Sequence, residues 1–307
     1  MPASFSVVFY AKEDLETLLS VIDYYSSIGA AGIEVFFDGA APFAAGALPQ
    51  GVRLTECTEA FWHAETGEGT PAGLNLRQRM AYTIAHRRCT ADWLLIVDTD
   101  ELLFSERSLG DVLADIRPAV ESARFPTAEA AFGPGDDVDL PFGATHFRTV
   151  MPEEKFARVG PDIYGPTAQL MRGGVVGHPE GKHVLRRGAK NVSINLHWSN
   201  RRGKSRKISR WIGVATEDRA GPAFLGHYDA RSFEHWREKW RRRLATSAGV
   251  KAKRGRAIAR FNAQIDADRD QAMEVFRRFY CLDERQVEML RSEGALLRRE
   301  GTRLVPA

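Results

Sequence analysis

The sequence predicts an α/β protein with a mixed, mostly parallel sheet flanked by helices, followed by a basic helical carboxyl-terminal extension. Three observations predict this fold class. Strand-like and helix-like segments alternate over the first ~100 residues. The most apolar strand-like segment, Trp93 to Val97, runs directly into a group of carboxylates. From Ser232 onward the chain has a helical pattern and is rich in Lys and Arg.

The spacing of apolar residues defines the first elements. Phe5 to Tyr10 has the composition of a buried strand, and Leu15 to Ile28 repeats apolar side chains at a helical period. Ile33 to Phe37 is a second strand, Val52 to Thr55 is a weaker third, and Leu76 to His86 is a helix. Strands separated by helices pair in parallel, and such sheets bind ligands beyond the carboxyl ends of their strands. The polar residues that follow the strands are therefore candidate site residues.

Shorter elements are expected after Asp98. Ser108 is a candidate N-cap for a helix through Val120. Four shorter strands are expected at Thr145 to Arg148, Ala168 to Met171, His183 to Arg186 and Val192 to Leu196. Two further helices are expected at Phe261 to Phe279 and Asp283 to Leu297. This pattern predicts one domain over residues 1–230 and a helical region, residues 231–307, packed on it.

Composition excludes several classes of protein. The chain has 307 residues, of which 44% are hydrophobic, and this excludes intrinsic disorder. No apolar stretch approaches the ~20 residues that a membrane span needs. Three widely spaced cysteines favour a reducing compartment and no zinc site. We therefore expect a protein of the cytoplasm or of the membrane periphery.

Charge is divided unevenly along the chain. Residues 1–150 hold ten basic and 22 acidic residues, a balance of −12, and residues 200–260 hold 18 basic and five acidic residues, a balance of +13. Either the two regions face each other or each has its own partner. Those partners would be a cation for the acidic region and a phosphate or polyanion for the basic one.

The sharpest motif follows the strand at Trp93 to Val97. Asp98, Asp100 and Glu101 place three carboxylates within four positions at the carboxyl end of a buried strand. These charges repel one another unless a positive group is bound. Oxygen ligands alone favour Mg²⁺ or Mn²⁺, which keep positions open for water and phosphate oxygens.

This segment resembles a known family. Asp98-x-Asp100-Glu101-Leu-Leu is similar to the DxDE-[FL]-L segment of glycosyltransferase family 2-like proteins of GT-A fold, on the branch related to family 92. Five other stretches match that family in order: Lys12-Glu13 after the first strand, Ile28-Gly29 to Phe37-Asp38, Gly181-Lys182-His183-Val-Leu-Arg186, Asn195-Leu196-His197, and Gly226-His227-Tyr228 with Arg231-Ser232, Glu234 and Lys239. The resemblance covers roughly Phe5 to Arg243, although Lys12 replaces the usual Asn.

The resemblance implies a metal-dependent, inverting glycosyltransferase. It would move a sugar from a UDP- or GDP-sugar donor to a glycan, a lipid-linked acceptor or another hydroxyl, with Mn²⁺ or Mg²⁺ neutralising the diphosphate. Asp98 and Asp100 would bind the metal, with His197 or His227 as a third ligand. The expected donor-binding residues are Glu13, Asp38, Asp98, Lys182, Arg186 and Tyr228.

The general base that deprotonates the acceptor hydroxyl is not singled out by any spacing. Glu153, Glu154 and Asp162 are the candidates, because they lie between the carboxylate motif and His197.

The basic region has three readings. Trp236 and Trp240 at helical spacing favour solvated basic faces with the tryptophans packed inward. The alternatives are contact with an anionic membrane surface, or a mobile loop at Arg201 to Arg210 that closes over the donor diphosphate.

The sequence leaves three rival functions to compare with a glycosyltransferase. A phosphoryl-transfer enzyme of the haloacid dehalogenase type fits poorly, because Leu102 stands where its motif has Thr or Val. A nucleic-acid-binding protein leaves the carboxylates without a role, so no nucleic-acid partner is expected. A catalytically inactive GT-A domain that only binds is the third alternative.

Overall fold

The computed structural model describes residues 1–177, 179–212, 223–245, 268–301 and 303–305. The chain forms two compact units. The first comprises Met1–Pro126 and Glu180–Leu225, and the second comprises Thr127–Pro179 and Gly226–Ala307. Each compact unit is made of two separate segments of the chain. The domain limits expected from the sequence, 1–230 and 231–307, stay a prediction.

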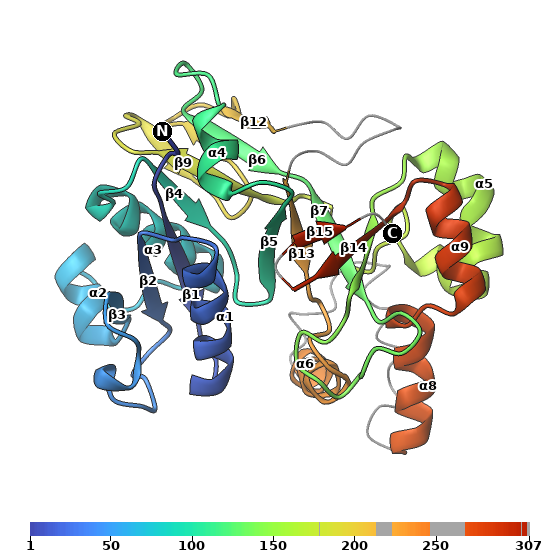
Figure 1. The fold of residues 1–307 in the computed structure, drawn as a ribbon. Helices are drawn as coiled ribbons and strands as arrows, with labels where there is room; N and C mark the ends of the chain where they lie inside the picture. The colour runs from blue at the N-terminus through green and yellow to red at the C-terminus, as the bar shows by residue number, and fades with distance from the viewer. Residues whose placement is uncertain (178, 213–222, 246–267, 302, 306–307) are drawn as a thin grey trace. The chain divides into compact units, whose positions relative to one another are not determined.

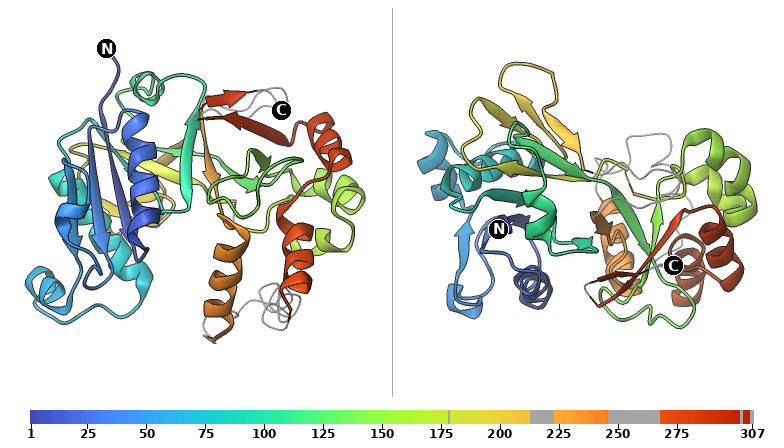
Figure 2. Two further views of the ribbon diagram at one scale, coloured as in Figure 1. Left: turned by 60° about the horizontal axis from the view of Figure 1, so that its bottom comes forward. Right: turned by 45° about the horizontal axis from the view of Figure 1, so that its top comes forward.

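A seven-stranded mixed sheet forms the centre of the first unit (Figures 1 and 2). Its strand order is β12-β6-β9-β4-β1-β2-β3; β9 runs antiparallel to both of its neighbours, and every other pair is parallel. The predicted fold class, a mixed and mostly parallel sheet flanked by helices, is confirmed. The strands are β1 (Phe5–Ala11), β2 (Gly32–Phe37), β3 (Val52–Glu56), β4 (Trp93–Ile96), β6 (Ser122–Phe125), β9 (Lys182–Arg186) and β12 (Ser209–Trp211).

The remaining elements of this unit are short helices and strands around the sheet. The helices are α1 (Leu15–Ser27), α2 (Glu59–Thr66), α3 (Leu74–Arg88), α4 (Leu109–Ala114) and the 3₁₀ helix η1 (Ala45–Ala47). The additional strands are β5 (Glu101–Ser105), the pair β10 (Val192–Ile194) and β11 (Ser199–Arg201), and β13 (Ala223–His227), which neighbours β5 and continues into the second unit.

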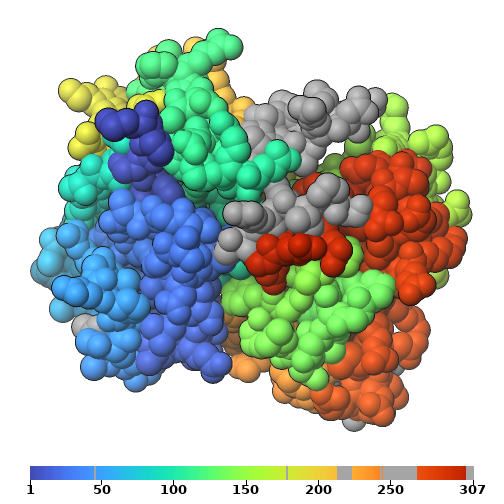
Figure 3. All heavy atoms as spheres, viewed as in Figure 1, coloured from blue at the N-terminus to red at the C-terminus, as the bar shows by residue number. Residues whose placement is uncertain are grey.

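Alternation along β1 explains why helices cover both faces of the sheet. Phe9 contacts Tyr25 of α1, with ring centroids 5.6 Å apart. Val8 packs in a cluster with Tyr82 and Ala85 of α3. Because neighbouring strand residues point to opposite faces, α1 and α3 lie on opposite sides of the sheet. The outer surface of α1 is exposed (blue in Figure 3).

Strand direction gathers four chain segments at one edge of the sheet. β1, β2 and β4 are parallel, so their carboxyl ends meet there. β9 is antiparallel to β4, with Ile96 opposite His183, and this brings the first residue of β9 to the same edge. Residues 98–101 therefore follow β4 directly at the place where the start of β9 meets it.

Among its described residues, the second unit contains four antiparallel strands and five helical segments. β7 pairs with β8, β8 with β14, and β14 with β15. The buried side chains of Trp236 and Trp240 confirm that these tryptophans pack inward. The elements are β7 (Thr127–Ala131), β8 (His146–Thr149), α5 (Glu153–Tyr164), η2 (Gly165–Leu170), α6 (Phe233–Ala245), α8 (Arg269–Tyr280), α9 (Glu284–Ser292), β14 (Leu296–Glu300) and β15 (Arg303–Val305).

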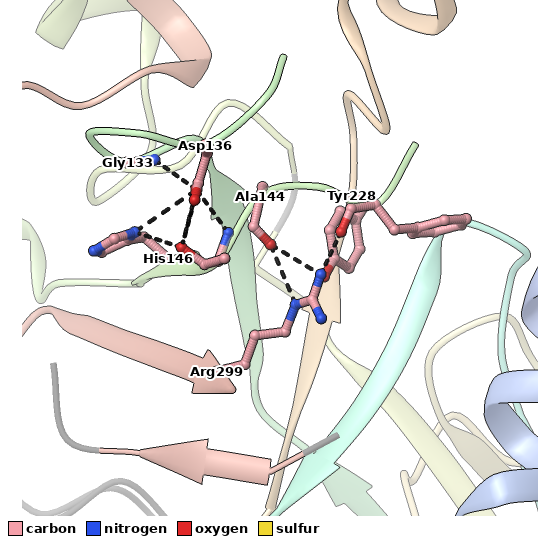
Figure 4. A network of polar contacts seen from close by, with 8 residues as sticks. Gly133, Asp136, Ala144, His146, Tyr228 and Arg299 are labelled. Carbon is pink, nitrogen blue, oxygen red and sulfur yellow. Dashed lines mark hydrogen bonds and ion pairs between the residues drawn. The ribbon is translucent and has the colours of Figure 1, made fainter. Parts of the chain in front are cut away.

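A polar network holds the loop before β8 (Figure 4). The Asp136 carboxylate accepts hydrogen bonds from the backbone N–H groups of Gly133 (2.8 Å) and Thr145 (2.9 Å). Burial alone would raise the pKa of Asp136, but hydrogen bonds from His146, Thr145 and Gly133 hold it below its ordinary value. Arg299 donates from Nε to the Ala144 carbonyl at 3.2 Å, and this contact ties β14 to the same loop.

Several expected elements differ in the structure. The strand expected at Ala168 to Met171 is wrong, because most of this segment belongs to the 3₁₀ helix η2. The helix capped by Ser108 ends at Ala114 and does not reach Val120. The helix expected over Asp283 to Leu297 ends at Ser292. Gly294 then adopts a positive φ of 60°, and β14 follows.

The remaining expected helix, Phe261 to Phe279, lies partly outside the described residues, and α8 accounts for the rest. Across the part of the chain that the structure describes, no helix is both long enough and apolar enough to cross a membrane.

Candidate functional site

The carboxylate motif forms a tight turn at the end of β4. The Glu101 N–H donates to the Asp98 carbonyl at 3.1 Å, and the Glu101 side chain accepts from the Asp98 N–H at 2.8 Å. Thr99 donates from its hydroxyl to Glu13 Oε1 at 3.3 Å. Glu101 is buried and lies behind the turn, so its carboxylate fixes the backbone that presents Asp98 and Asp100.

Lys182 supplies a positive charge to this turn. Its Nζ donates to Asp98 Oδ2 at 2.7 Å and lies 3.4 Å from Glu101 Oε2. The side chain is 1% exposed. Burial alone would lower the pKa of Lys182, but the charges of Asp98 and Glu101 raise it above its ordinary value, so the ammonium stays charged. The sequence predicts Lys182 as a donor-binding residue, whereas its observed contacts are the carboxylates of the turn.

Several charged groups meet at this turn. The Asp98 and Glu101 carboxylates lie within ion-pair distance of the Lys182 ammonium, the charge of Asp100 also acts on it, and the Asp98 side chain is 37% exposed. A partly open cluster of carboxylates is a place where a cation can bind.

The carboxylates of the turn suit a metal ion whose remaining ligands come from the substrate. Within the described residues, no group of three or more His, Cys, Asp or Glu side chains is arranged to hold a metal ion. Mg²⁺ is commonly bound by one or two carboxylates together with substrate phosphates. Asp98 and Asp100 fit that requirement.

A second polar cluster lies at the end of β2. Asp38 accepts from Arg77 Nε at 3.1 Å and Nη2 at 3.0 Å, and from the Tyr10 hydroxyl at 2.6 Å. Burial opposes ionisation, but these bonds and the Arg77 charge hold the pKa of Asp38 below its ordinary value. Tyr82 of α3 lies between the clusters, with its hydroxyl 3.4 Å from Asp98 Oδ1. Asp38, predicted as a donor contact, is thus fixed in place by α3.

Arg77 and Tyr82 are residues that the sequence reasoning missed. Both lie on α3, which was expected only as a covering helix. One feature of the sequence could have indicated Arg77: it lies in the first turn of a helix that follows Gly73. In a parallel sheet, such a helix begins near the carboxyl ends of the strands, where ligands bind.

Two histidines of the first unit, His183 and His197, lie near the start of β9. His197 places Nδ1 at 2.9 Å from the Gly181 carbonyl, directly before Lys182. His183 is fully buried, with Nε2 3.0 Å from the Ser199 hydroxyl. Burial, together with the charges of Lys182 and Arg124, keeps the pKa of His183 well below its ordinary value, so His183 is neutral. His197 remains the candidate metal ligand of this unit.

Arg186 is not brought together with Asp98. It stands at the far end of β9, opposite Trp93, because β9 runs antiparallel to β4. Its guanidinium lies 4.1 Å from the centroid of the Trp93 ring and donates to the Val120 carbonyl at 3.1 Å. The donor contact expected of Arg186 therefore lacks support, since Lys182 and Arg186 occupy opposite edges of the sheet.

The other predicted site residues belong to the second unit. Glu153, Glu154 and Asp162 are exposed on α5. Tyr228 is fully buried, its hydroxyl lies 3.5 Å from the Ala144 carbonyl, and burial raises its pKa. His227 ends β13 and lies close to Gly177. The catalytic, donor and metal roles of these residues stay predictions.

Comparison with known proteins gives only structural matches. No family model matches this chain, and no curated protein matches it. A structure described as a mycobacterial protein is similar at 15% identity and TM-score 0.30, covering 60% of this chain and 54% of that one. GalNAc-T7 with UDP, GalNAc and Mn²⁺ is similar at 9% identity and TM-score 0.37, covering 94% and 56%.

Galactosyltransferase LgtC in complex with donor and acceptor sugar analogs is similar at 13% identity and TM-score 0.25, covering 59% of this chain and 57% of that one. The chain thus spans little more than half the length of each of these three proteins. With identities and TM-scores this low, the function proposed below rests on the residues of the site themselves.

Proposed function

We propose that this protein is a glycosyltransferase that uses a nucleotide-sugar donor, a UDP- or GDP-sugar, and transfers the sugar to a hydroxyl of a glycan or lipid-linked acceptor. The observation that carries the proposal is the partly exposed carboxylate turn at the end of β4, where Asp98, Asp100 and Glu101 lie within four positions and Asp98 is 37% exposed. Such a carboxylate cluster at the carboxyl edge of the sheet suits a divalent cation and the diphosphate that it binds.

Each residue of the turn has a distinct role in this proposal. Asp98 and Asp100 would hold Mn²⁺ or Mg²⁺, which when bound neutralises charge on the leaving diphosphate. Lys182 and Glu101 are positioning residues, because they hold Asp98 by its Oδ2 and by its backbone N–H. Asp38, held by Arg77 and Tyr10, and Glu13, held by Thr99, offer carboxylate oxygens to donor hydroxyl or base N–H groups.

The reaction itself needs one proton acceptor. The bond between the anomeric carbon and the diphosphate oxygen breaks, a bond from the acceptor oxygen to that carbon forms, and the hydroxyl proton passes to a base. Glu153, Glu154 and Asp162 stay the candidate bases; all three are exposed.

The test is calorimetric titration of UDP- and GDP-sugars with and without Mn²⁺, combined with mass spectrometry of the sugar products. Asp100→Asn removes one candidate metal ligand and should weaken metal-dependent donor binding by about 100-fold or more. Asp23→Asn, an exposed acid on α1 of the same unit, is the matched control and should bind like the wild type. The proposal would be refuted if donor affinity were the same with and without Mn²⁺ and the same in Asp100→Asn as in the wild type.

A further inference from the structure

A separate basic pocket lies in the first unit between α3 and β10. Its volume is about 290 Å³. The polar residues of its lining are Arg79, Thr83, His86 and Arg87 from α3, with Asn191, Ser193 and Arg202 from the segment around β10 and β11. Among the residues that the structure describes, no carboxylate is part of this lining. A concave site with several cationic groups and no acid has the chemistry of an anion site.

The helix and the β10–β11 hairpin place these groups around one space. Arg79, Thr83, His86 and Arg87 share one face of α3, since residues three and four positions apart are neighbours on a helix. Arg79 is anchored by an Nε hydrogen bond to the Ile194 carbonyl at 3.3 Å. Arg202 donates its N–H to the carbonyl of Asn191 at 2.7 Å, and Asn191 adopts a positive φ of 53° to make this turn.

The arginines of this pocket differ from the other arginines on the same helix. Arg77 pairs with Asp38, and Arg88 pairs with Glu34 and lies near Glu65. Within the part of the chain that the structure describes, neither Arg79 nor Arg87 forms an ion pair, although both lie on α3 between Arg77 and Arg88. The same holds for Arg202, whereas its neighbour Arg201 pairs with Glu121.

We propose that this pocket binds a phosphate or diphosphate group. Guanidinium groups match phosphate oxygens in pairs of parallel hydrogen bonds. The Ser193 hydroxyl adds a neutral polar group, whereas Thr83 donates its hydroxyl to the Arg79 carbonyl at 2.7 Å. The remaining lining includes Leu76, which is 44% exposed, and Met80, so the bound molecule carries an apolar or sugar body beside its phosphate. The site is distinct from the carboxylate turn and does not depend on the proposed transferase activity.

Inorganic pyrophosphate in metal-free buffer with chelator is the direct probe. Calorimetry at low ionic strength should detect binding by the wild type. Arg79→Gln and Arg202→Gln should each weaken it about tenfold or more, because each removes charge-assisted hydrogen bonds. Arg88→Gln, on the same helix but outside the pocket lining, should bind within about twofold of the wild type.

Asp100→Asn separates this site from the donor site. It should leave pyrophosphate binding without metal unchanged, even if the proposed transferase function fails. Absence of pyrophosphate binding by the wild type, or equal binding by wild type, Arg79→Gln and Arg202→Gln, would overturn the proposal.

Flotation with phosphatidic acid vesicles, against phosphatidylcholine vesicles, identifies the source of the phosphate. Retention on phosphatidic acid that is lost in Arg79→Gln assigns the pocket to a lipid headgroup. Pyrophosphate binding without vesicle retention assigns it to a soluble phosphate. If both Arg79→Gln and Arg202→Gln are still retained on the vesicles and the wild type does not bind pyrophosphate, the proposal that this pocket binds phosphate is wrong.

Discussion

Two ion pairs, one in each unit, join a cation to a carboxylate in different surroundings. In the second unit, Glu129 and Arg148 pair at 2.6 Å, and both side chains are 1% exposed. Glu129 also accepts from the N–H groups of Val176 (2.8 Å) and Gly177 (2.5 Å). In the first unit, Lys182 pairs with Asp98 at 2.7 Å, but Asp98 remains 37% exposed.

The difference lies in access to solvent. The Glu129 carboxylate accepts hydrogen bonds from Arg148 and from two backbone N–H groups, and both side chains of the pair are closed off from water. The turn at Asp98 brings the carboxylates of Asp98 and Glu101 to the Lys182 ammonium, and it is partly open. The enclosed pair serves stability, and the open turn is where the proposed cation would bind.

Glu129→Gln should have the largest effect on stability. Removing one charge of an enclosed pair leaves Arg148 uncompensated, and this should lower the free energy of unfolding by about 3 to 5 kcal/mol. Urea unfolding followed by circular dichroism measures the loss. Glu153→Gln, at an exposed site on α5, is the control and should change stability by less than about 0.5 kcal/mol. A loss below about 1 kcal/mol for Glu129→Gln would contradict a structural role.

Lys182→Met should cost less, about 2 to 3 kcal/mol, because the partly exposed Asp98 keeps some hydration when its partner is lost. The pKa of Lys182 is raised in the folded state, so its contribution is complete below the ordinary value of 10.5. It is lost as pH rises from 10.5 through the raised value. Unfolding of wild type and variant from neutral to alkaline pH tests this.

The stability difference between the two proteins should stay constant up to pH 10.5 and shrink above it. Lys190→Met, at an exposed position, serves as the control with no such pH dependence. A difference that grows on the alkaline side would argue against a stabilising ammonium at Lys182.

Asp38→Asn should cost about 1 to 2 kcal/mol, because it weakens charge-assisted bonds from Arg77 and Tyr10. The pKa of Asp38 is lowered in the folded state, so its contribution is present above the ordinary value of 3.8. It disappears as pH falls from 3.8 through the lowered value. Thermal unfolding across the acidic range measures this, with Asp23→Asn as control. A difference between wild type and Asp38→Asn that persists at the acid end would count against the prediction.

Asp100→Asn should have the smallest effect on stability, within about 0.5 kcal/mol, since neutralising one of three neighbouring carboxylates also relieves the repulsion among them. Urea unfolding beside the donor titrations would show whether binding and stability separate. A loss as large as that of Glu129→Gln would make Asp100 structural and would end the contrast between the two sites.

Much of the first unit could be predicted from the sequence. The period of apolar residues located β1, α1, β2, α3 and β4 to within one or two residues. The position of the carboxylate turn also followed, because it comes directly after the apolar strand β4. These features are local, so a window of a few residues contains the information that decides them.

The spacing of apolar residues predicts the wrong element where a strand and a helix would show the same apolar pattern. Leu296 and Leu297 continue the spacing of α9, yet they belong to β14, since Gly294 breaks the helix and β8 offers a pairing partner. The sequence predicts a strand at Ala168 to Met171 for the same reason, but most of this segment forms part of η2. A short apolar run fits either state, and its tertiary neighbours decide between them.

Tertiary structure alone decided which cation meets which carboxylate. The sequence contained Lys182 and Arg186 as two equal candidates on one strand, and the carboxylates of Asp98 and Asp100 as a site awaiting a cation. The antiparallel direction of β9 sent Lys182 to the carboxylates and Arg186 to Trp93. Strand direction depends on pairing between segments far apart in the chain, and the two-residue period of a strand reads the same in either direction.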